Sequence, residues 1–224
     1  MTKTILEEYR KCHDRLHLSS GRTEEYIKTQ SDFNKETDQI NMFLEVLSEL
    51  DALNVDKPIM IELGAGRFPT YSKCFTDVFP GGRSICTEVR TDYIKSGKKN
   101  LPGSSWYHCY SGKPRHAQEK KPDEDQLGNA SMMSMAKLFE KENLSNEDVH
   151  ILHMDIQGSE TDVLYELNET GLYKNIKCLF VAIHDHSFGK CEDILDSWNV
   201  KYRFKHPTVG GYGDGLIVAT HNFG

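Results

Sequence analysis

The sequence predicts an α/β fold: a mostly parallel sheet of seven strands, helices on both faces, and a closing antiparallel hairpin. Short apolar runs alternate with amphipathic segments from residue 58 to residue 198, as in chains of βαβ units. The last two apolar runs, 200–205 and 215–220, are joined without a helical pattern, which favours antiparallel pairing. The 224 residues fit a main domain, 55–224, after an N-terminal helical extension, 1–54.

Two helices are expected in the extension. Residues 2–18 carry apolar side chains at helical spacing, and the polar residues 19–31 indicate a loop. A second, longer helix begins after Ser31 and Asp32, which are suited to cap it. One face of this helix is apolar, with Ile40, Phe43, Leu44, Leu47 and Leu50.

In the main domain, strands and helices are expected to alternate. The strands are predicted at 58–63, 83–88, 104–109, 149–155, 177–184, 200–205 and 215–220. The helices are predicted at 71–78, 91–99, 132–142, 159–167 and 191–198. Residues 110–131, rich in Lys, Pro, Gly, Asp and Gln, are predicted to form a long loop, of the kind that often covers a functional site.

Composition and charge limit the classes of molecule that the protein is expected to bind. The net charge of −7 argues against broad binding to nucleic acid or to a membrane surface. The N-terminus is polar and acidic, and no apolar run reaches the roughly 20 residues of a membrane span. We therefore expect a cytoplasmic protein without a nucleic-acid or membrane partner, and leave a homodimer open. The six cysteines form no C-x-x-C pair, and Cys86 and Cys178 are expected in the core.

The first functional signal is a glycine turn after a buried strand. The strand carries Glu62 near its carboxyl end, and Gly64, Ala65 and Gly66 follow. A dinucleotide fingerprint needs a third glycine, but here Arg67-Phe68-Pro69 stands in its place. The pattern Glu-x-Gly-x-Gly resembles the first motif of S-adenosylmethionine-dependent methyltransferases with a Rossmann-like fold. The resemblance implies that these four residues bind that cofactor.

Two further strand ends extend this cofactor site. Glu88 ends the second strand about 20 residues after the glycines, the spacing at which a carboxylate accepts hydrogen bonds from ribose hydroxyls. The third strand ends near Tyr110 and Ser111. In methyltransferases of this class that edge supplies adenine contacts, so the resemblance implies that role for both residues.

The second strong signal is the block from Val149 to Leu164. A strand delivers Asp155 to its carboxyl end, Gly158 permits a turn, and Ser159 is predicted to cap the next helix. Asp155, Gly158, Glu160 and Leu164 match Asp-x-x-Gly-x-Glu-x-x-x-Leu, so the chain resembles the FkbM family of methyltransferases. The resemblance implies methyl transfer to an oxygen, often a hydroxyl of a sugar or secondary metabolite, in surface-polysaccharide or natural-product synthesis.

The fifth strand ends in a run of ionisable residues, His184, Asp185 and His186, beside Asp155. Two roles compete for this strand end. Asp155, His184 and His186 are the candidate catalytic residues, a histidine acting as general base toward the acceptor, and Asp155 is also a candidate cofactor-binding residue. Alternatively, Asp155 with Asp185 or His186 holds a divalent cation such as magnesium. Further substrate contacts are predicted from Gln157, Asp185, His206, Tyr212 and Asp214.

Two other functions remain open. One is a non-catalytic binding subunit, although such a module does not need four ionisable groups at one end of its sheet. The other is a nucleotide-sugar oxidoreductase, which the missing third glycine disfavours.

Overall fold

The strands follow the predicted chain order, with one addition. The computed structural model describes residues 32–111, 130–145, 147–156, 158–184, 188–205 and 215–220. The strands are β1 (Ile59–Leu63), β2 (Arg83–Glu88), β3 (Ser105–Ser111), β4 (Ser131–Met133), β5 (Val149–Met154), β6 (Ile176–Ile183), β7 (Lys201–Lys205) and β8 (Gly215–Thr220). The added strand is β4, which pairs in parallel with the end of β3.

The helices between the strands also match the prediction closely. They are α3 (Asp32–Ala52), α4 (Thr70–Val78), α5 (Thr91–Asn100), α7 (Met135–Lys141), α8 (Glu160–Thr170), the 3-10 helix η1 (Leu172–Asn175) and α9 (Phe188–Ser197). Helix α7 begins later than predicted because Ser131–Met133 belong to β4, and Ser134 then caps α7 by accepting the Lys137 N–H at 3.1 Å. The helix predicted at 2–18 lies outside the described residues.

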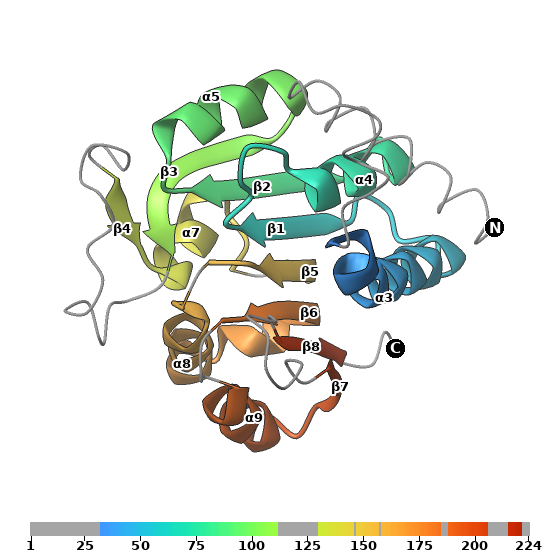
Figure 1. Ribbon diagram of the computed structural model, residues 1–224, viewed down its shortest axis with the longest axis vertical. Helices are drawn as coiled ribbons and strands as arrows, with labels where there is room; N and C mark the ends of the chain where they lie inside the picture. The colour runs from blue at the N-terminus through green and yellow to red at the C-terminus, as the bar shows by residue number, and fades with distance from the viewer. Residues whose placement is uncertain are drawn as a thin grey trace.

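Within the described ranges the strands form one sheet, in the order β4-β3-β2-β1-β5-β6-β8-β7 (Figure 1). Strand β8 runs antiparallel to both of its neighbours, and the other pairs are parallel. The predicted parallel sheet with a closing antiparallel hairpin is therefore confirmed. Strand order reverses between β1 and β5, and open α/β sheets bind ligands at the carboxyl ends of the strands at such a switch point.

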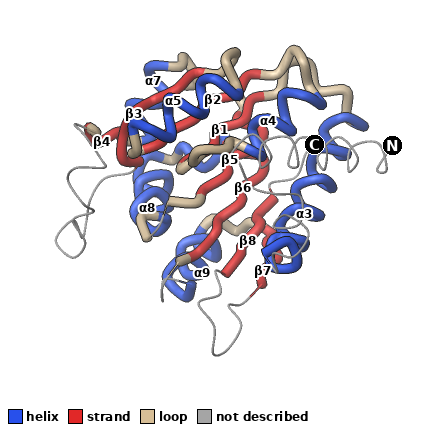
Figure 2. Tube along the Cα trace, turned by 45° about the horizontal axis from the view of Figure 1, so that its top comes forward, coloured by secondary structure: helices blue, strands red, loops and turns tan. Residues whose placement is uncertain are grey.

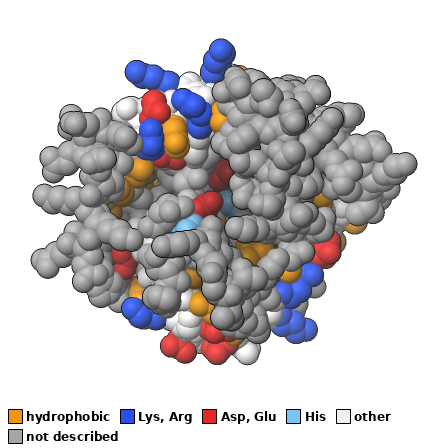
Figure 3. Space-filling view, in the orientation of Figure 1, with side chains coloured by type: hydrophobic (Ala, Val, Ile, Leu, Met, Phe, Trp, Pro, Cys, Tyr) orange, Lys and Arg blue, Asp and Glu red, His pale blue; other side chains and the backbone are white. Residues whose placement is uncertain are grey.

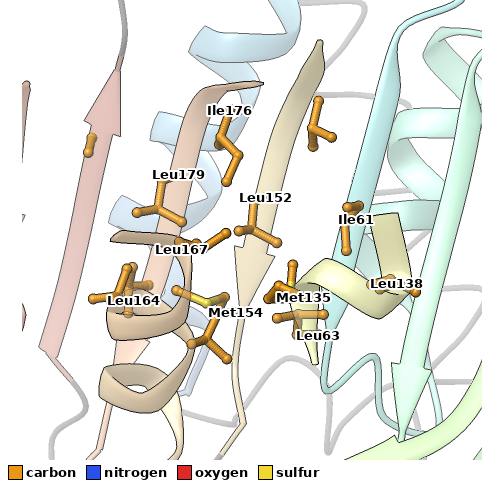
Figure 4. Packing of buried hydrophobic residues seen from close by; sticks show 14 of the residues in the cluster. Ile61, Leu63, Met135, Leu138, Leu152, Met154, Leu164, Leu167, Ile176 and Leu179 are labelled. Carbon is orange, nitrogen blue, oxygen red and sulfur yellow. The ribbon is translucent and has the colours of Figure 1, made fainter. Parts of the chain in front are cut away.

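Alternation along the strands sends side chains to two hydrophobic cores. Helices α7, α8 and α9 cover one face of the sheet, and α3, α4 and α5 cover the other (Figures 1 and 2). Ile61 and Leu63 of β1 pack with β5, β6 and α8 on the first face (Figure 4). Met60 packs against α3 and α4 on the second face. Glu62 shares the side of Met60, so it is held beneath α4 rather than in solvent.

Helix α3 belongs to the second core. Phe43, Leu47 and Leu50 are fully buried, which confirms the apolar face predicted for them. The ring of Phe43 lies 5.7 Å from that of Phe180 on β6, in edge contact. The helix therefore covers the sheet beside the switch point, while the boundary placed at residue 54 stays a prediction.

Two sequence expectations concern membrane-spanning segments and cysteine thiols. Among the described helices, none combines the length and apolar character needed to cross a membrane. The five cysteines in the described ranges are free and buried, including Cys86 and Cys178, as expected for core thiols. Burial raises the pKa of the Cys86 thiol to about 12, so this thiol is a poor nucleophile.

Candidate active site

The glycine turn is built around a close approach of two backbones. Gly64 has a φ of +77°, and a Cβ placed on it would lie 1.9 Å from the backbone oxygen of Asp155. The N–H of Asp155 donates to the Leu63 oxygen at 3.0 Å, which holds the ends of β1 and β5 together. Only glycine fits at this position, and the turn therefore brings Asp155 directly beside the predicted cofactor loop.

At Gly66 the backbone conformation, and not a close contact, favours glycine. Its φ is +66°, but a Cβ there would meet no described atom within 4 Å. Its N–H donates to the Glu88 carboxylate at 2.9 Å. Ala65 between the two glycines is buried, and its N–H donates to the Thr87 oxygen at 3.0 Å. The glycine turn is thus hydrogen-bonded to the end of β2, and the space beside the Cα of Gly66 is open.

Glu88 is fixed at the mouth of this turn. One carboxylate oxygen accepts the N–H of Gly66, and the other accepts the N–H groups of Val89 at 2.8 Å and Arg90 at 2.9 Å. A carboxylate has about four acceptor positions, so capacity for a further donor remains. The structure therefore holds Glu88 where a ribose partner was predicted, and that role stays a prediction.

Glu62 is a buried carboxyl beneath the turn. It is 3 % exposed and accepts the Ser72 N–H of α4 at 3.1 Å. Burial, with a smaller contribution from the charges of Asp155 and Glu88, raises its pKa to about 7, although the hydrogen bonds from Ser72 oppose the shift. Glu62, Glu88 and Asp155 thus lie close enough at the ends of β1, β2 and β5 for the two outer charges to act on Glu62, a setting that favours a positively charged ligand.

The predicted adenine contacts, Tyr110 and Ser111, lie at the end of β3, next to the end of β2. The Ser111 hydroxyl is buried and lies 2.8 Å from the hydroxyl of Thr87. Tyr110 is half-buried and is in register with Met132 of β4. His108, which sequence reasoning did not single out, is in register with Glu88, and its Nε2 lies 2.8 Å from the Val89 oxygen. No feature of its sequence surroundings distinguishes it from other strand histidines.

On the other side of the switch point, a histidine lies between two carboxylates. Nδ1 of His184 is 2.7 Å from Glu160 Oε1, and Nε2 is 3.3 Å from Asp155 Oδ1. His184 follows β6, Asp155 follows β5, and Glu160 is the first residue of α8. The prediction that His184 and Asp155 lie side by side is confirmed. Figure 3 shows acidic and histidine side chains next to each other near the centre of the face in view.

The cap predicted for α8 is wrong in detail. Ser159 holds the N-cap position but makes no side-chain cap hydrogen bond, and its φ of −103° and ψ of 7° are not extended. The extended conformation normally aims an N-cap hydroxyl at the first turn of the helix. Instead, Glu160 accepts the Gly158 N–H at 2.9 Å. Sequence reasoning had seen Glu160 only as a position of the family pattern, and that pattern was the signal available for it.

Solved structures share this fold. No protein-family model and no curated protein matches the sequence. A human methyltransferase 10 domain containing protein superposes with a TM-score of 0.54 at 12 % identity, covering 83 % of this chain and 81 % of its own. The METTL16 methyltransferase domain gives 0.53 at 14 % identity, covering 83 % and 67 %. The N-terminal domain of human METTL16 in complex with SAH gives 0.50 at 14 % identity, covering 83 % and 69 %.

The chain has a Rossmann-like methyltransferase fold. In this methyltransferase fold, the described part of the candidate site comprises the glycine turn, Glu62, Glu88, Tyr110, Ser111, Asp155 and His184. The remaining predicted site residues lie outside the described residues: Gln157, Asp185, His186, His206, Tyr212 and Asp214.

Proposed function

We propose that this chain is an S-adenosylmethionine-dependent O-methyltransferase of the cytoplasm. Its acceptor is a hydroxyl of a sugar, sugar nucleotide or related small metabolite. One observation carries the proposal: at the switch point of a methyltransferase fold, a glycine turn and three carboxyl groups adjoin a histidine held beside Asp155. The glycine turn and carboxyl groups suit the cofactor, and the histidine suits the acceptor.

The cofactor half of the proposal is supported by charge and shape. S-adenosylmethionine carries a sulfonium and an ammonium group, and Glu88 and Asp155 supply negative charge where they would lie, which also raises the pKa of the buried Glu62. Glu88 is expected to accept the ribose hydroxyls, and the open side of Gly66 leaves room for the ligand backbone. Adenine is expected beside Tyr110 and Ser111.

The acceptor half needs a base, because a neutral hydroxyl is a poor nucleophile. The Asp155 side chain is 46 % exposed and that of His184 is 10 % exposed, so Asp155 faces outward and His184 lies just behind it. The protein must align the acceptor oxygen with the sulfonium methyl and remove the hydroxyl proton. We assign proton removal to His184, with Asp155 orienting the acceptor.

The acceptor class is inferred from the FkbM-like block, in which Asp155, Gly158, Glu160 and Leu164 match. Gln157, Asp185, His186, His206, Tyr212 and Asp214 are assigned to the acceptor side from sequence alone. We expect no nucleic-acid partner, in line with the net charge of −7. Surface-polysaccharide or natural-product synthesis is the setting that the resemblance implies.

A divalent cation such as magnesium is a variant of this proposal. Asp155 offers the exposed carboxylate that magnesium prefers, and its predicted co-ligands are Asp185 and His186. Within the described ranges, no three His, Cys, Asp or Glu side chains gather as a metal site. Turnover that survives dialysis against EDTA would exclude the variant, and turnover restored only by magnesium would establish it.

The proposal is tested with isotope-labelled S-adenosylmethionine and a panel of sugar nucleotides, free sugars and hydroxylated metabolites. We expect label transfer to at least one hydroxyl acceptor, with the methyl group located on oxygen by mass spectrometry. Transfer only to amines would contradict oxygen as the acceptor atom. Reduction of a nicotinamide cofactor without methyl transfer would favour the oxidoreductase.

A further inference from the structure

A continuous row of polar contacts runs inward from the candidate site. It starts at Asp155 Oδ1, which lies 3.3 Å from His184 Nε2. Nδ1 of His184 lies 2.7 Å from Glu160 Oε1, and Glu160 Oε2 accepts the Gly158 N–H at 2.9 Å. Side-chain exposure falls along the row, from 46 % at Asp155 to 10 % at His184 and 0 % at Glu160. The row therefore joins the proposed acceptor side to a carboxylate that solvent does not reach.

Burying Glu160 is costly unless its charge is stabilised. Both of its oxygens have a partner, and it is the first residue of α8, where the helix dipole favours negative charge. No lysine or arginine forms a salt bridge with it among the described residues. The side chain that stabilises the Glu160 carboxylate is thus the His184 ring. The charge of Glu160 and the protonation of His184 therefore depend on each other.

The two carboxylates compete for the ring proton of neutral His184. A carboxylate can only accept, so each favours a proton on the nitrogen that faces it. Glu160 is closer, at 2.7 Å against 3.3 Å, and is fully buried while Asp155 is 46 % exposed. Short contacts and low solvent screening both strengthen a charge-assisted hydrogen bond. The balance therefore favours the proton on Nδ1.

We propose that Glu160 is a positioning residue, which keeps the ring proton on Nδ1 and leaves Nε2 as the basic nitrogen beside Asp155. The inference rests on the proposed function and names the nitrogen that acts in it. As the acceptor oxygen bonds to the methyl carbon, the O–H proton moves to Nε2. The carbon–sulfur bond breaks with its electron pair staying on sulfur. The products are a methyl ether, a neutral thioether and an imidazolium that donates to both Asp155 and Glu160.

Glu160→Gln tests the role because it keeps the shape of the side chain but can donate as well as accept. The amide then allows the ring proton on either nitrogen, and we expect turnover to fall by up to the roughly 100- to 10,000-fold that a positioned general base contributes. Affinity for S-adenosylhomocysteine, measured by titration calorimetry, is expected to stay within about 2-fold, because Glu160 does not face the cofactor turn. Equal losses in turnover and affinity would indicate a purely structural role and overturn the proposal.

Glu166→Gln is the matched control. Glu166 is also a buried glutamate of α8, and it accepts the Ala136 N–H at 3.1 Å, away from His184. It reports what a buried Glu-to-Gln change on this helix does to turnover through folding alone. A loss in Glu166→Gln as large as that in Glu160→Gln would contradict a specific role for Glu160.

The ring tautomer is read directly, without any turnover, by NMR of protein labelled with heavy nitrogen in histidine. His184→Gln identifies the His184 signals. We expect neutral His184 to carry its proton on Nδ1 in the native protein and to show a mixture in Glu160→Gln. A proton on Nε2 in the native protein overturns the inference. If neutral His184 carries its proton on Nδ1 but the protein transfers no methyl group, the proposed function is refuted. The role of Glu160 in positioning the ring of His184 would then still hold.

Discussion

The close approach at Gly64 allows a sharp prediction. In Gly64→Ala the new Cβ would lie 1.9 Å from the Asp155 oxygen and 2.9 Å from the Asp155 carbonyl carbon, both backbone atoms. Backbone atoms cannot rotate away as a side-chain end can, so β1 and β5 must separate at their carboxyl ends. That movement would stretch the hydrogen bond from the Asp155 N–H to the Leu63 oxygen and displace Asp155 from the candidate site.

The magnitude follows from three contributions. A non-glycine residue at a φ of +77° costs about 1–2 kcal/mol. Overpacking against fixed neighbours adds about 1–3 kcal/mol, and the lost hydrogen bond about 1 kcal/mol. Gly64→Ala is therefore expected to lower the free energy of unfolding by about 3–6 kcal/mol. Gly66→Ala, with a φ of +66° and no described atom within 4 Å of its Cβ, should cost only about 1–2 kcal/mol.

Urea unfolding of the two variants beside the native protein measures these values, and the Gly66 variant serves as the control for backbone strain. The difference between the variants isolates the contact with Asp155. Equal losses of stability in both would refute the close approach of β1 and β5 as the reason for glycine at position 64.

Two further predictions concern the folded core. Because burial raises the pKa of Glu62 from 4.5 to about 7, the folded state holds this proton more tightly. Its contribution to the free energy of unfolding is thus lost as the pH rises from 4.5 to 7, by up to about 3 kcal/mol. Glu62→Gln should remove that slope in urea unfolding at several pH values, and an unchanged slope would contradict the raised pKa. Gly97→Ala places a Cβ 2.1 Å from the Trp106 ring and should lower stability by about 1–3 kcal/mol. Gly189→Ala, with open space at its Cβ, should not lower stability, and equal thermal midpoints for both variants would rule out the predicted clash.

Local sequence patterns were enough to predict most of the fold and the cofactor side of the candidate site. Glu62, Gly64, Gly66 and Glu88 lie within one strand–helix–strand segment, from β1 through α4 to β2, so sequence spacing alone groups them. Parallel topology did the rest, since neighbouring strands end at the same edge of the sheet and bring Asp155 to the same edge as the residue after β6. Met154 lies opposite Val181 in the register of β5 and β6, so the next pair is Asp155 with Ala182, two residues before His184. The topology therefore brings Asp155 and His184 to one end of the sheet but does not by itself fix their contact.

Contacts between residues far apart in the chain could not be predicted from the sequence. The clash that makes Gly64 necessary joins it to Asp155, and the Glu160–His184 contact joins a helix start to a strand end 24 residues away. Neither leaves a periodic signal in the chain. Strand β4 was missed because three residues are too few to show alternation.

Binding of S-adenosylmethionine at the switch point is measured by calorimetric titration of the purified protein with S-adenosylhomocysteine. We expect saturable binding at one site per chain. We also expect binding to weaken about 10-fold or more in Glu88→Gln, in which a neutral amide replaces the charged acceptor for the ribose hydroxyls. Absence of binding to the native protein, or full affinity in Glu88→Gln, would refute cofactor binding at this end of the sheet.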